Sequence, residues 1–453
     1  MTQLLINLLV FLVSVLLLIT VHEFGHFCVA RWLGVKVVRF SVGFGRPLWR
    51  WIGRSGTEYV IALLPLGGYV RLLDERDGGE VPEKDQPLAF NRQSILKRAL
   101  IILAGPGINV LFAVFAFWIM WMIGVERMRP VVGEVIPESI AAQSGFPVGA
   151  EIMAVNGQPT TNWPKVTIAL VGWLGETGDL PIQARLKNEP PRTYIMHLNN
   201  WRTNSLQPDP LTSLGLKPFQ PEIPLTIGKV RADSPAALAG LRVGDKILTI
   251  NGEKLTDWVD LVKQIQSHPN ELVQLTVERG HEPIHLDIKV GRQLSRFQWI
   301  GYMGIEPIAV DWPVGMVYQL KYSPGSAFLA SLKEVQVLTK FNFVVLAKLI
   351  RGQVSMKSLG GPISIYQSTS FAFHQGLIIF IGFLGLLSLM LAIVNILPIP
   401  GLDGGHILFF IIEAIMRRPL SPAVQMLIVR LGFIFLLVIM MQATINDIFR
   451  SVS

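Results

Sequence analysis

Residues 16–32 read LLLITVHEFGHFCVARW, an apolar run that contains two histidines and a glutamate. His22 and His26 are four positions apart, so on an α-helix their side chains lie one turn apart on the same face. Two imidazoles in this arrangement can bind one zinc ion, at about 2.0–2.1 Å from each nitrogen. Glu23 follows the first histidine and is placed to take a proton from water beside such an ion. The stretch therefore predicts a metal site with its own general base.

The apolar surroundings strengthen this interpretation. A five-residue pattern with two free positions also occurs by chance, and histidines on a soluble helix usually have a structural role. At membrane depth each ionisable residue costs roughly 2.5–3.5 kcal/mol on insertion scales, so three of them need a compensating partner such as a cation. His281 and His285 share the same spacing, but HEPIHLDI reads as a β-strand on which the two side chains lie far apart. We expect that second pair to be surface residues.

The composition is that of a membrane protein. Of 453 residues, 51% are hydrophobic and only 16% are charged, which is too apolar for an ordinary soluble protein. The single cysteine, Cys28, excludes an internal disulfide and a zinc site built from several cysteines. We attribute the net charge of +8 to basic residues that orient the spans in the membrane, and we expect no nucleic-acid partner. Four stretches are long enough to cross a bilayer: Leu4–Ala30, Ala99–Gly124, Gly376–Leu397 and Leu427–Ile445.

Lysine and arginine orient these spans. Residues 1–30 contain neither, whereas basic residues follow the first span, precede the second and occupy the link between the third and fourth. The positive-inside rule then predicts that residues 31–98 and 398–426 are cytoplasmic. Both termini and the long segment 125–375 are expected outside. In a bacterium this describes a multi-pass protein of the inner membrane whose long segment and termini are periplasmic.

The segment outside the membrane contains an internal repeat. SIAAQSGFPVGAEIMAVNGQPTTNW begins at Ser139 and SPAALAGLRVGDKILTINGEKLTDW at Ser234, with a constant offset of 95 residues. In both copies a short helix ends at glycine and is followed by a strand and an Asn-Gly turn. The pattern resembles PDZ domains of the bacterial type, which bind an extended chain end by strand addition. A role as spacers only is the alternative.

We therefore expect a polytopic α-helical membrane protein with two extracytoplasmic PDZ domains of the α+β class. Residues 324–351 have apolar positions at helical spacing that lysines interrupt, which predicts a surface or membrane-lying helix. The expected parts are the first two spans with a cytoplasmic β-hairpin, PDZ domain 1, PDZ domain 2, an amphipathic helical region, and the last two spans: residues 1–126, 127–220, 221–312, 313–375 and 376–453.

A catalytic zinc site needs a third protein ligand, and NILPIPGLDGGHILFF, residues 395–410, offers two. Two prolines end the third span, so Asp403 lies on irregular backbone at membrane depth, which is tolerated only where it is buried in protein or lines a wet cavity. The topology brings this turn and His22 to the same side and depth of the membrane. Asp403 is the expected ligand. His406 is its competitor, and capping of the following helix is the alternative role for Asp403.

HEFGH in the first span, LDGG at the end of the third and the PDZ-like repeat between them resemble the site-2 protease family of intramembrane zinc metalloproteases. The resemblance covers essentially the whole chain. It implies Zn²⁺ bound by His22, His26 and Asp403, with Glu23 as the catalytic base. It also implies that Asn395, in NxxPxPxLDGG, contacts the substrate backbone or polarises its carbonyl near the metal.

The same resemblance gives meaning to SVGFG, residues 41–45, and to EYVIALLPLGGYVRLL behind it, which reads as two apolar strands around a Pro-Leu-Gly-Gly turn. In the family such a region forms a β-hairpin that dips into the membrane and holds the substrate as an added strand. A plain cytoplasmic hairpin is the alternative. We expect Gly43, Gly45 and Pro398 to lie along the substrate. SLGGPISI, Ser358–Ile365, also resembles a family segment, but the sequence indicates no role for it.

The implied reaction is hydrolysis of a peptide bond within the transmembrane helix of a single-span substrate. Helical carbonyls are hydrogen-bonded, so the helix has to unwind first, and strand addition keeps its freed backbone groups paired. The family implies an anti-sigma factor already trimmed outside, in an envelope stress response, and remnant signal peptides. The PDZ pair then acts as a size filter or a tail binder. The alternative is a PDZ-containing membrane scaffold or adaptor with a structural zinc site, but such a site needs no glutamate beside its first ligand.

Overall fold

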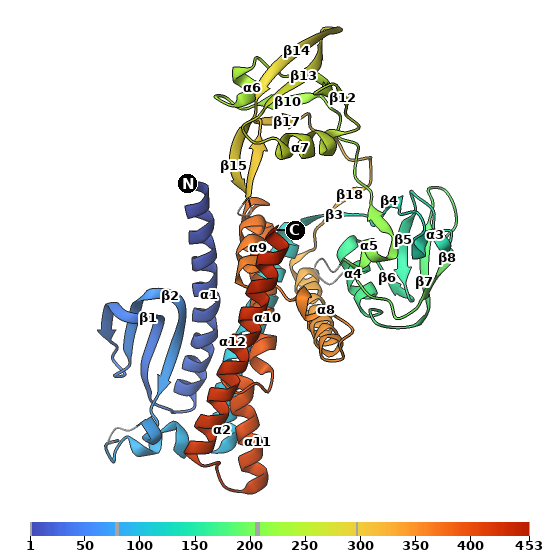
Figure 1. The fold of residues 1–453 in the computed structure, drawn as a ribbon. Helices are drawn as coiled ribbons and strands as arrows, with labels where there is room; N and C mark the ends of the chain where they lie inside the picture. Colours follow the sequence, from blue (N-terminus) through green and yellow to red (C-terminus); the bar gives the residue numbers. More distant parts are fainter. Residues whose placement is uncertain (1, 78–80, 204–208, 296–297, 453) are drawn as a thin grey trace. The chain divides into compact units, whose positions relative to one another are not determined.

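The chain divides into two compact units. One is mainly helical and consists of residues up to 127, residues 171–175 and residues 319–447, whereas the other is rich in strands and comes mainly from the residues between 128 and 318. The four apolar segments of the sequence belong to the helical unit (Figure 1). The computed structural model describes residues 2–77, 81–203, 209–295 and 298–452.

Within the described residues, four helices are long and apolar enough to cross a membrane, which confirms the expected spans. α2 and α10 pack against each other at the centre of the unit, with 44% and 39% of their apolar windows buried. The other two bury only 11% and 6%, and such exposed apolar surface suits contact with lipid. The four helices are α1 (Thr2–Trp32), α2 (Ile95–Ile123), α10 (Leu377–Ile396) and α12 (Pro422–Val452).

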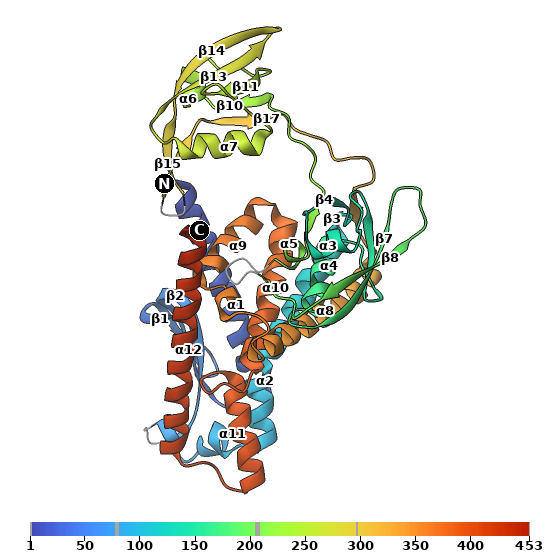
Figure 2. The same cartoon turned by 45° about the vertical axis from the view of Figure 1, so that its right-hand side comes forward.

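Shorter helices complete the helical unit around this central pair. α8 (Pro324–Ile350) confirms the helix predicted for residues 324–351 and packs against α2. α9 (Pro362–His374) contacts α1 and α10 (Figure 2). α11 (Asp403–Met416) contacts α2 and α10. The first residue of α11 is thereby held next to the centre of the helical unit.

The segment between α1 and α2 is an antiparallel sheet of two long strands, β1 (Val37–Ile52) and β2 (Glu58–Leu72). Ser41 of β1 pairs with Val60 on one side and with Tyr69 on the other. The first half of β1 therefore lies between the two halves of β2. This differs from the expectation of a hairpin in which the strands on either side of the Pro-Leu-Gly-Gly segment pair with each other.

The bend of β1 explains the difference. Gly43 and Gly45 have φ angles of +91° and +88°, a region that side chains other than glycine rarely adopt. Beyond this bend β1 folds back, so that Trp49 pairs with Ile61 on the outer side of the sheet. A β-carbon on Gly43 would lie 2.9 Å from the carbonyl oxygen of Leu64. The bend therefore depends on glycine.

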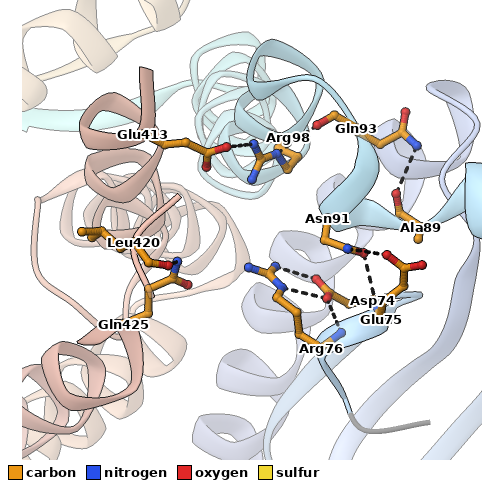
Figure 3. Close-up of polar contacts among 10 residues, drawn as sticks. All are labelled: Asp74, Glu75, Arg76, Ala89, Asn91, Gln93, Arg98, Glu413, Leu420 and Gln425. Carbon is orange, nitrogen blue, oxygen red and sulfur yellow. Dashed lines mark hydrogen bonds and ion pairs between the residues drawn. The ribbon is translucent and has the colours of Figure 1, made fainter. Parts of the chain in front are cut away.

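Ion pairs fasten the link between this sheet and α2 (Figure 3). Arg76 donates to Asp74, with 2.6 Å between Nη2 and Oδ2. Arg98, buried in the first turn of α2, donates to Glu413 of α11 at 2.6 Å and lies 4.9 Å from the centre of the Phe410 ring. These contacts hold the start of α2 against α11. Three 3₁₀ turns lie in the link, at Glu75–Asp77, Gln86–Leu88 and Phe90–Arg92.

The strand-rich unit contains two copies of one fold, and each copy comes from one half of the sequence repeat. The four-stranded sheets have the orders β6-β5-β7-β8 and β12-β11-β13-β14, and the two-stranded sheets β4-β9 and β10-β17 also correspond. The predicted Asn-Gly turns are present at Asn156 and Asn251, with φ angles of 47° and 49°. The short helices and strands predicted from the repeat are therefore confirmed. His281 and His285 are both exposed, as expected.

The elements of the first copy are β4 (Val132–Val135), α3 (Ile140–Gln143), β5 (Glu151–Val155), β6 (Gln158–Pro159), α4 (Trp163–Val171), β7 (Gly178–Arg185), β8 (Arg192–Leu198), α5 (Pro210–Leu214) and β9 (Leu216–Pro218). Those of the second copy are β10 (Ile227–Val230), α6 (Pro235–Leu238), β11 (Lys246–Ile250), β12 (Glu253–Lys254), α7 (Trp258–Ser267), β13 (Leu272–Arg279), β14 (Glu282–Lys289), β15 (Gly291–Ser295), β16 (Gln298–Tyr302) and β17 (Ile305–Pro307). The remaining sheet pairs β3 (Val125–Met128) with β18 (Val317–Leu320).

Ser358–Ile365, the segment without a role in the sequence, forms the approach to α9. Asp447 of α12 accepts the backbone N–H groups of Gly361 and Ser364, at 3.0 and 2.9 Å, and the Ser364 hydroxyl as well. Asn446 donates to a backbone carbonyl just before this segment. The first N–H groups of a helix have no partner within the helix, and an anion there also complements the helix dipole. α12 therefore holds the start of α9.

Candidate metal and catalytic site

The two histidines of the HEFGH stretch lie on the side of α1 that faces α2. His22 and His26 are only 7% and 8% exposed. Glycines allow the close approach of the two helices, because a β-carbon on Gly25 would lie 2.3 Å from the carbonyl oxygen of Ala104. A β-carbon on Gly105 would lie 2.3 Å from Nε2 of His26. The imidazoles therefore occupy space that a side chain on α2 would fill.

Asp403 begins α11 directly after the turn that follows α10. A β-carbon on Gly404 would lie 2.1 Å from the carbonyl oxygen of Leu397, so only glycine permits the tight return of the chain here. Oδ2 of Asp403 lies 3.1 Å from Nε2 of His22 and 3.5 Å from Nε2 of His26. The N-cap position of α11 is occupied by the preceding leucine. The capping alternative for Asp403 is therefore not what the structure shows.

These three atoms have the spacing of ligands around a zinc ion. The two Nε2 atoms are 3.3 Å apart, and the distances to Oδ2 are 3.1 and 3.5 Å. For tetrahedral bonds near 2.05 Å, neighbouring ligand atoms are about 3.3 Å apart. Oδ2 of Asp403 is also buried without a hydrogen-bond donor from the described residues. His22, His26 and Asp403 together therefore fit a zinc ion.

Glu23 and Asn395 line the same cavity as these ligands. The cavity has a volume of about 280 Å³. Oε2 of Glu23 accepts the backbone N–H of Val70 in β2, at 3.0 Å. The carboxylate of Glu23 is thus held between the cavity and the sheet. The residues that line the cavity are Ile19, His22, Glu23, Leu391, Asn395, Gly401, Leu402, Asp403 and His406.

Of the remaining residues predicted from the sequence, one lines this cavity and three do not. His406 lines the cavity but is not part of the group of three converging ligand atoms found among the described residues. Gly43 and Gly45 lie at the bend of β1, and Pro398 lies in the turn between α10 and α11. Those three do not belong to the described lining of the cavity. Their contact with substrate stays a prediction.

Residues of α2 at this site were not predicted from the sequence. The carbonyl oxygen of Ile101 lies 2.8 Å from Nδ1 of His26, and Nδ2 of Asn109 lies 3.1 Å from Nδ1 of His22. Asn109 is fully buried. An asparagine inside an apolar span was a usable signal, because polar side chains at membrane depth usually have partners in the protein. The backbone carbonyl of Ile101 gave no such signal.

Comparison with known proteins matches the chain over nearly its full length. The sequence model of peptidase family M50 matches residues 10–439. The regulator of sigma-E protease RseP from Escherichia coli is 41% identical over 440 residues, which is 97% of this chain and 98% of that protein. A Vibrio cholerae chain provisionally named as a zinc metalloprotease is 40% identical over 452 residues, 99% of this chain and 100% of that one. A solved PDZ domain of an SdrC-like protein from Listeria innocua covers 19% of this chain and 97% of its own, with 21% identity and a TM-score of 0.17.

Proposed function

The chain belongs to peptidase family M50, and from that premise we propose which of its residues carry the reaction. It is a zinc metalloprotease of the site-2 type, which cleaves substrates within the membrane in the sigma-E pathway. In our proposal His22, His26 and Asp403 hold the zinc ion and Glu23 is the catalytic base. The observation that carries this assignment is the convergence of two Nε2 atoms and one carboxylate oxygen within 3.1–3.5 Å, in the cavity that Glu23 lines.

The mechanism follows from the positions of these side chains. A bound zinc ion supplies a Lewis acid, which polarises the peptide carbonyl and makes water more acidic. Glu23 takes the proton of the attacking water and then gives it to the leaving amine. The amide of Asn395 lies in the same cavity and donates a hydrogen bond to the oxygen that gains negative charge. The buried histidines stay in place during this step because α2 packs behind them.

The substrate in this proposal is the unwound part of a single transmembrane helix. Support comes from the N–H of Val70, which is directed at Glu23, so this edge of β2 faces the catalytic base. A substrate added as a strand along the edge keeps its backbone groups paired while its scissile bond lies near Glu23. Gly43 and Gly45, which bend β1, and Pro398, in the turn after α10, remain the further positions predicted to lie along the substrate.

We assign residues 127–220 and 221–312 to two PDZ domains on the basis of the repeat signature and the matching order of their strands. They lie on the periplasmic side of the inner membrane, with both termini, as the distribution of lysine and arginine predicts. The relatives named as regulators of sigma-E protease support an anti-sigma factor, trimmed beforehand, as one substrate. Remnant signal peptides are the second kind. The PDZ pair excludes untrimmed ectodomains or binds a chain end.

Cleavage by the purified full-length chain tests this function. The chain, loaded with zinc in detergent, is incubated with a single-span substrate, with and without a chelator. We expect E23Q to retain zinc but to lose cleavage by at least a hundredfold, because proton transfer contributes 10²–10⁴ to such reactions. H22A/H26A and D403A are expected to lose zinc, and H406A to keep it. H281A/H285A is the matched control, since these two histidines have the same spacing but are exposed in the second repeat.

The outcomes separate the enzyme from the scaffold. Cleavage by E23Q at the rate of the unmodified chain excludes Glu23 as the base. Zinc that stays bound in H22A/H26A excludes the proposed metal site. A chain that binds zinc through these residues but cleaves no single-span substrate is the PDZ-containing scaffold with a structural metal.

A further inference from the structure

Both proposed histidine ligands are held from behind by α2. Nδ1 of His26 is 2.8 Å from the carbonyl oxygen of Ile101, and Nδ1 of His22 is 3.1 Å from the side-chain amide of Asn109. The opposite ring atoms, Nε2, are the ones that point toward Asp403. The two contacts to α2 therefore fix which way each ring faces.

The chemistry of the imidazole ring decides what Asn109 contributes. A neutral imidazole that gives its Nε2 lone pair to a metal carries its hydrogen on Nδ1, so Nδ1 has to donate a hydrogen bond. The carbonyl of Ile101 is such an acceptor for His26. For His22, only the carbonyl oxygen of the Asn109 side chain can act in this way, because the NH₂ end of the amide donates.

The surroundings of Asn109 allow this orientation. The NH₂ and carbonyl ends of a side-chain amide have nearly the same shape, so hydrogen bonds decide which end faces a given neighbour. Oδ1 of Asn109 is buried and has no hydrogen-bond partner among the described residues. No other contact therefore opposes the orientation in which Oδ1 faces Nδ1 of His22.

The main chain of Asn109 is fixed independently of its side chain. The hydroxyl of Ser388, on α10, donates to the backbone carbonyl of Asn109 at 2.9 Å. Asn109 and Ser388 are both fully buried. Asn109 thus lies where α1, α2 and α10 meet, and α10 leads into the turn that carries Asp403.

We propose that Asn109 is a positioning residue of the metal site: its side-chain oxygen accepts the Nδ1–H of His22 and so directs Nε2 of that ring at the zinc ion. The inference rests on the proposed assignment of His22, His26 and Asp403 as ligands. It adds a residue that touches neither the metal nor the substrate. Removal of such a partner typically lowers metal affinity by 10–100-fold.

Zinc affinity of the full-length chain, measured by competition with a chromophoric chelator, tests the proposal without reference to proteolysis. N109L removes the acceptor and keeps the branching of the side chain, and we expect its zinc dissociation constant to rise at least tenfold. N109D keeps an acceptor for Nδ1–H, and we expect it to bind zinc at least as tightly as the unmodified chain. N342L, which changes an asparagine of α8 whose side-chain amide donates to the carbonyl of Leu338 in the same helix, is the matched control and should leave the constant unchanged.

The visible absorption of the cobalt-substituted chain reports the ligand geometry directly. We expect N109L to alter this spectrum and N109D to give a spectrum like that of the unmodified chain. A dissociation constant for N109L within twofold of the unmodified chain overturns the proposal, and so does an N109D protein that is folded but binds zinc as weakly as N109L. If N109L does not fold, N109A takes its place with the same expected direction. Retention of zinc by H22A is the separate result that overturns the underlying metal site.

Discussion

Gly105 sets how closely α2 can approach the proposed zinc ligands. A β-carbon at this position would lie 2.3 Å from Nε2 of His26 and 2.8 Å from Cε1 of His22, closer than real atoms pack. At the next glycine in the same helix, Gly107, a β-carbon would lie within 4 Å of no described residue beyond its chain neighbours and the backbone of its own helix. The two positions therefore differ in their contact with the proposed ligands.

We expect G105A to lower zinc affinity by at least tenfold and to lower cleavage accordingly, because the added methyl group displaces the imidazoles. G107A should bind zinc normally and raise helix stability by up to about 1 kcal/mol. Zinc content after dialysis and the thermal unfolding midpoint in detergent measure both effects. Equal zinc binding by the two variants contradicts the packing described here.

At this scale the sequence predicted the residues whose chemistry shows in their spacing or their position. His22 and His26 were recognised by their offset of four, and Asp403 by the topology of the spans. Asn109 and Gly105 act across the contact between two helices, and that contact depends on which faces of α1 and α2 meet. Hydropathy gave the existence of both helices but not their relative rotation.

Among the elements, the second repeat carries an ion pair between Asp245 and Arg279. Asp245 is 1% exposed and accepts hydrogen bonds from Arg279, at 2.7 Å, and from the backbone N–H of Arg242, at 2.8 Å. Burial by itself would raise the pKa of Asp245, but the hydrogen bonds from Arg279 and Arg242 outweigh it and lower the pKa below its ordinary value. The corresponding residue of the first repeat is Ala150, which is fully buried.

This difference predicts that the second repeat is more sensitive to acid than the first. Because the folded pKa of Asp245 is lowered, the pair contributes its full stability above about pH 4, where the unfolded carboxyl is also ionised. The contribution disappears as the pH falls from there through the folded pKa. Hydrogen exchange of β11 and of its counterpart β5 in the full-length chain, corrected for intrinsic rates, measures the effect.

We expect protection of β11 to decrease below about pH 4 and that of β5 to change less. D245N should remove the difference in acid sensitivity between β11 and β5. It should also lower the free energy of unfolding of the second repeat by about 2 kcal/mol at pH 7, since hydrogen bonds to a charged partner are lost. D179N, on the exposed side of the first repeat, is the control for a surface carboxylate. If D245N retains the acid sensitivity of β11, another group is responsible.

Elements with a strong period were predictable from the sequence, and the bent sheet was not. The apolar spans and the 95-residue repeat gave helices and strands close to their observed bounds. In β1 the pairing depends on a bend at Gly43 and Gly45, and the alternation of apolar residues does not say that a strand folds back. The role of Ser358–Ile365 was likewise hidden, because its partner Asp447 is remote in sequence.

At the scale of the whole molecule, the strand-rich unit and the helical unit have separable tasks if the repeats act as a size filter. Deletion of residues 125–310, with a short Gly/Ser linker in their place, should permit cleavage of a substrate that still has its full ectodomain. Cleavage of the trimmed substrate should change little, because the proposed zinc ligands and the proposed base Glu23 all lie in the helical unit.

Cleavage of trimmed and untrimmed single-span substrates in vesicles, compared between the full chain and the deleted one, measures this. E23Q in the deleted chain is the control for contaminating proteases. If the untrimmed substrate stays intact while the trimmed one is still processed, the repeats are not a size filter, and binding of a chain end is left as their role.

The proposed ligand set also has a consequence for the moment at which the chain becomes active. Two of the proposed ligands belong to α1, whereas the proposed carboxylate comes from α11, which is made much later in translation. A nascent chain that has inserted its first two helices thus has only part of a metal-binding set. On this assignment the protease stays inert during its own synthesis until α11 has been made and has packed against α2 and α10.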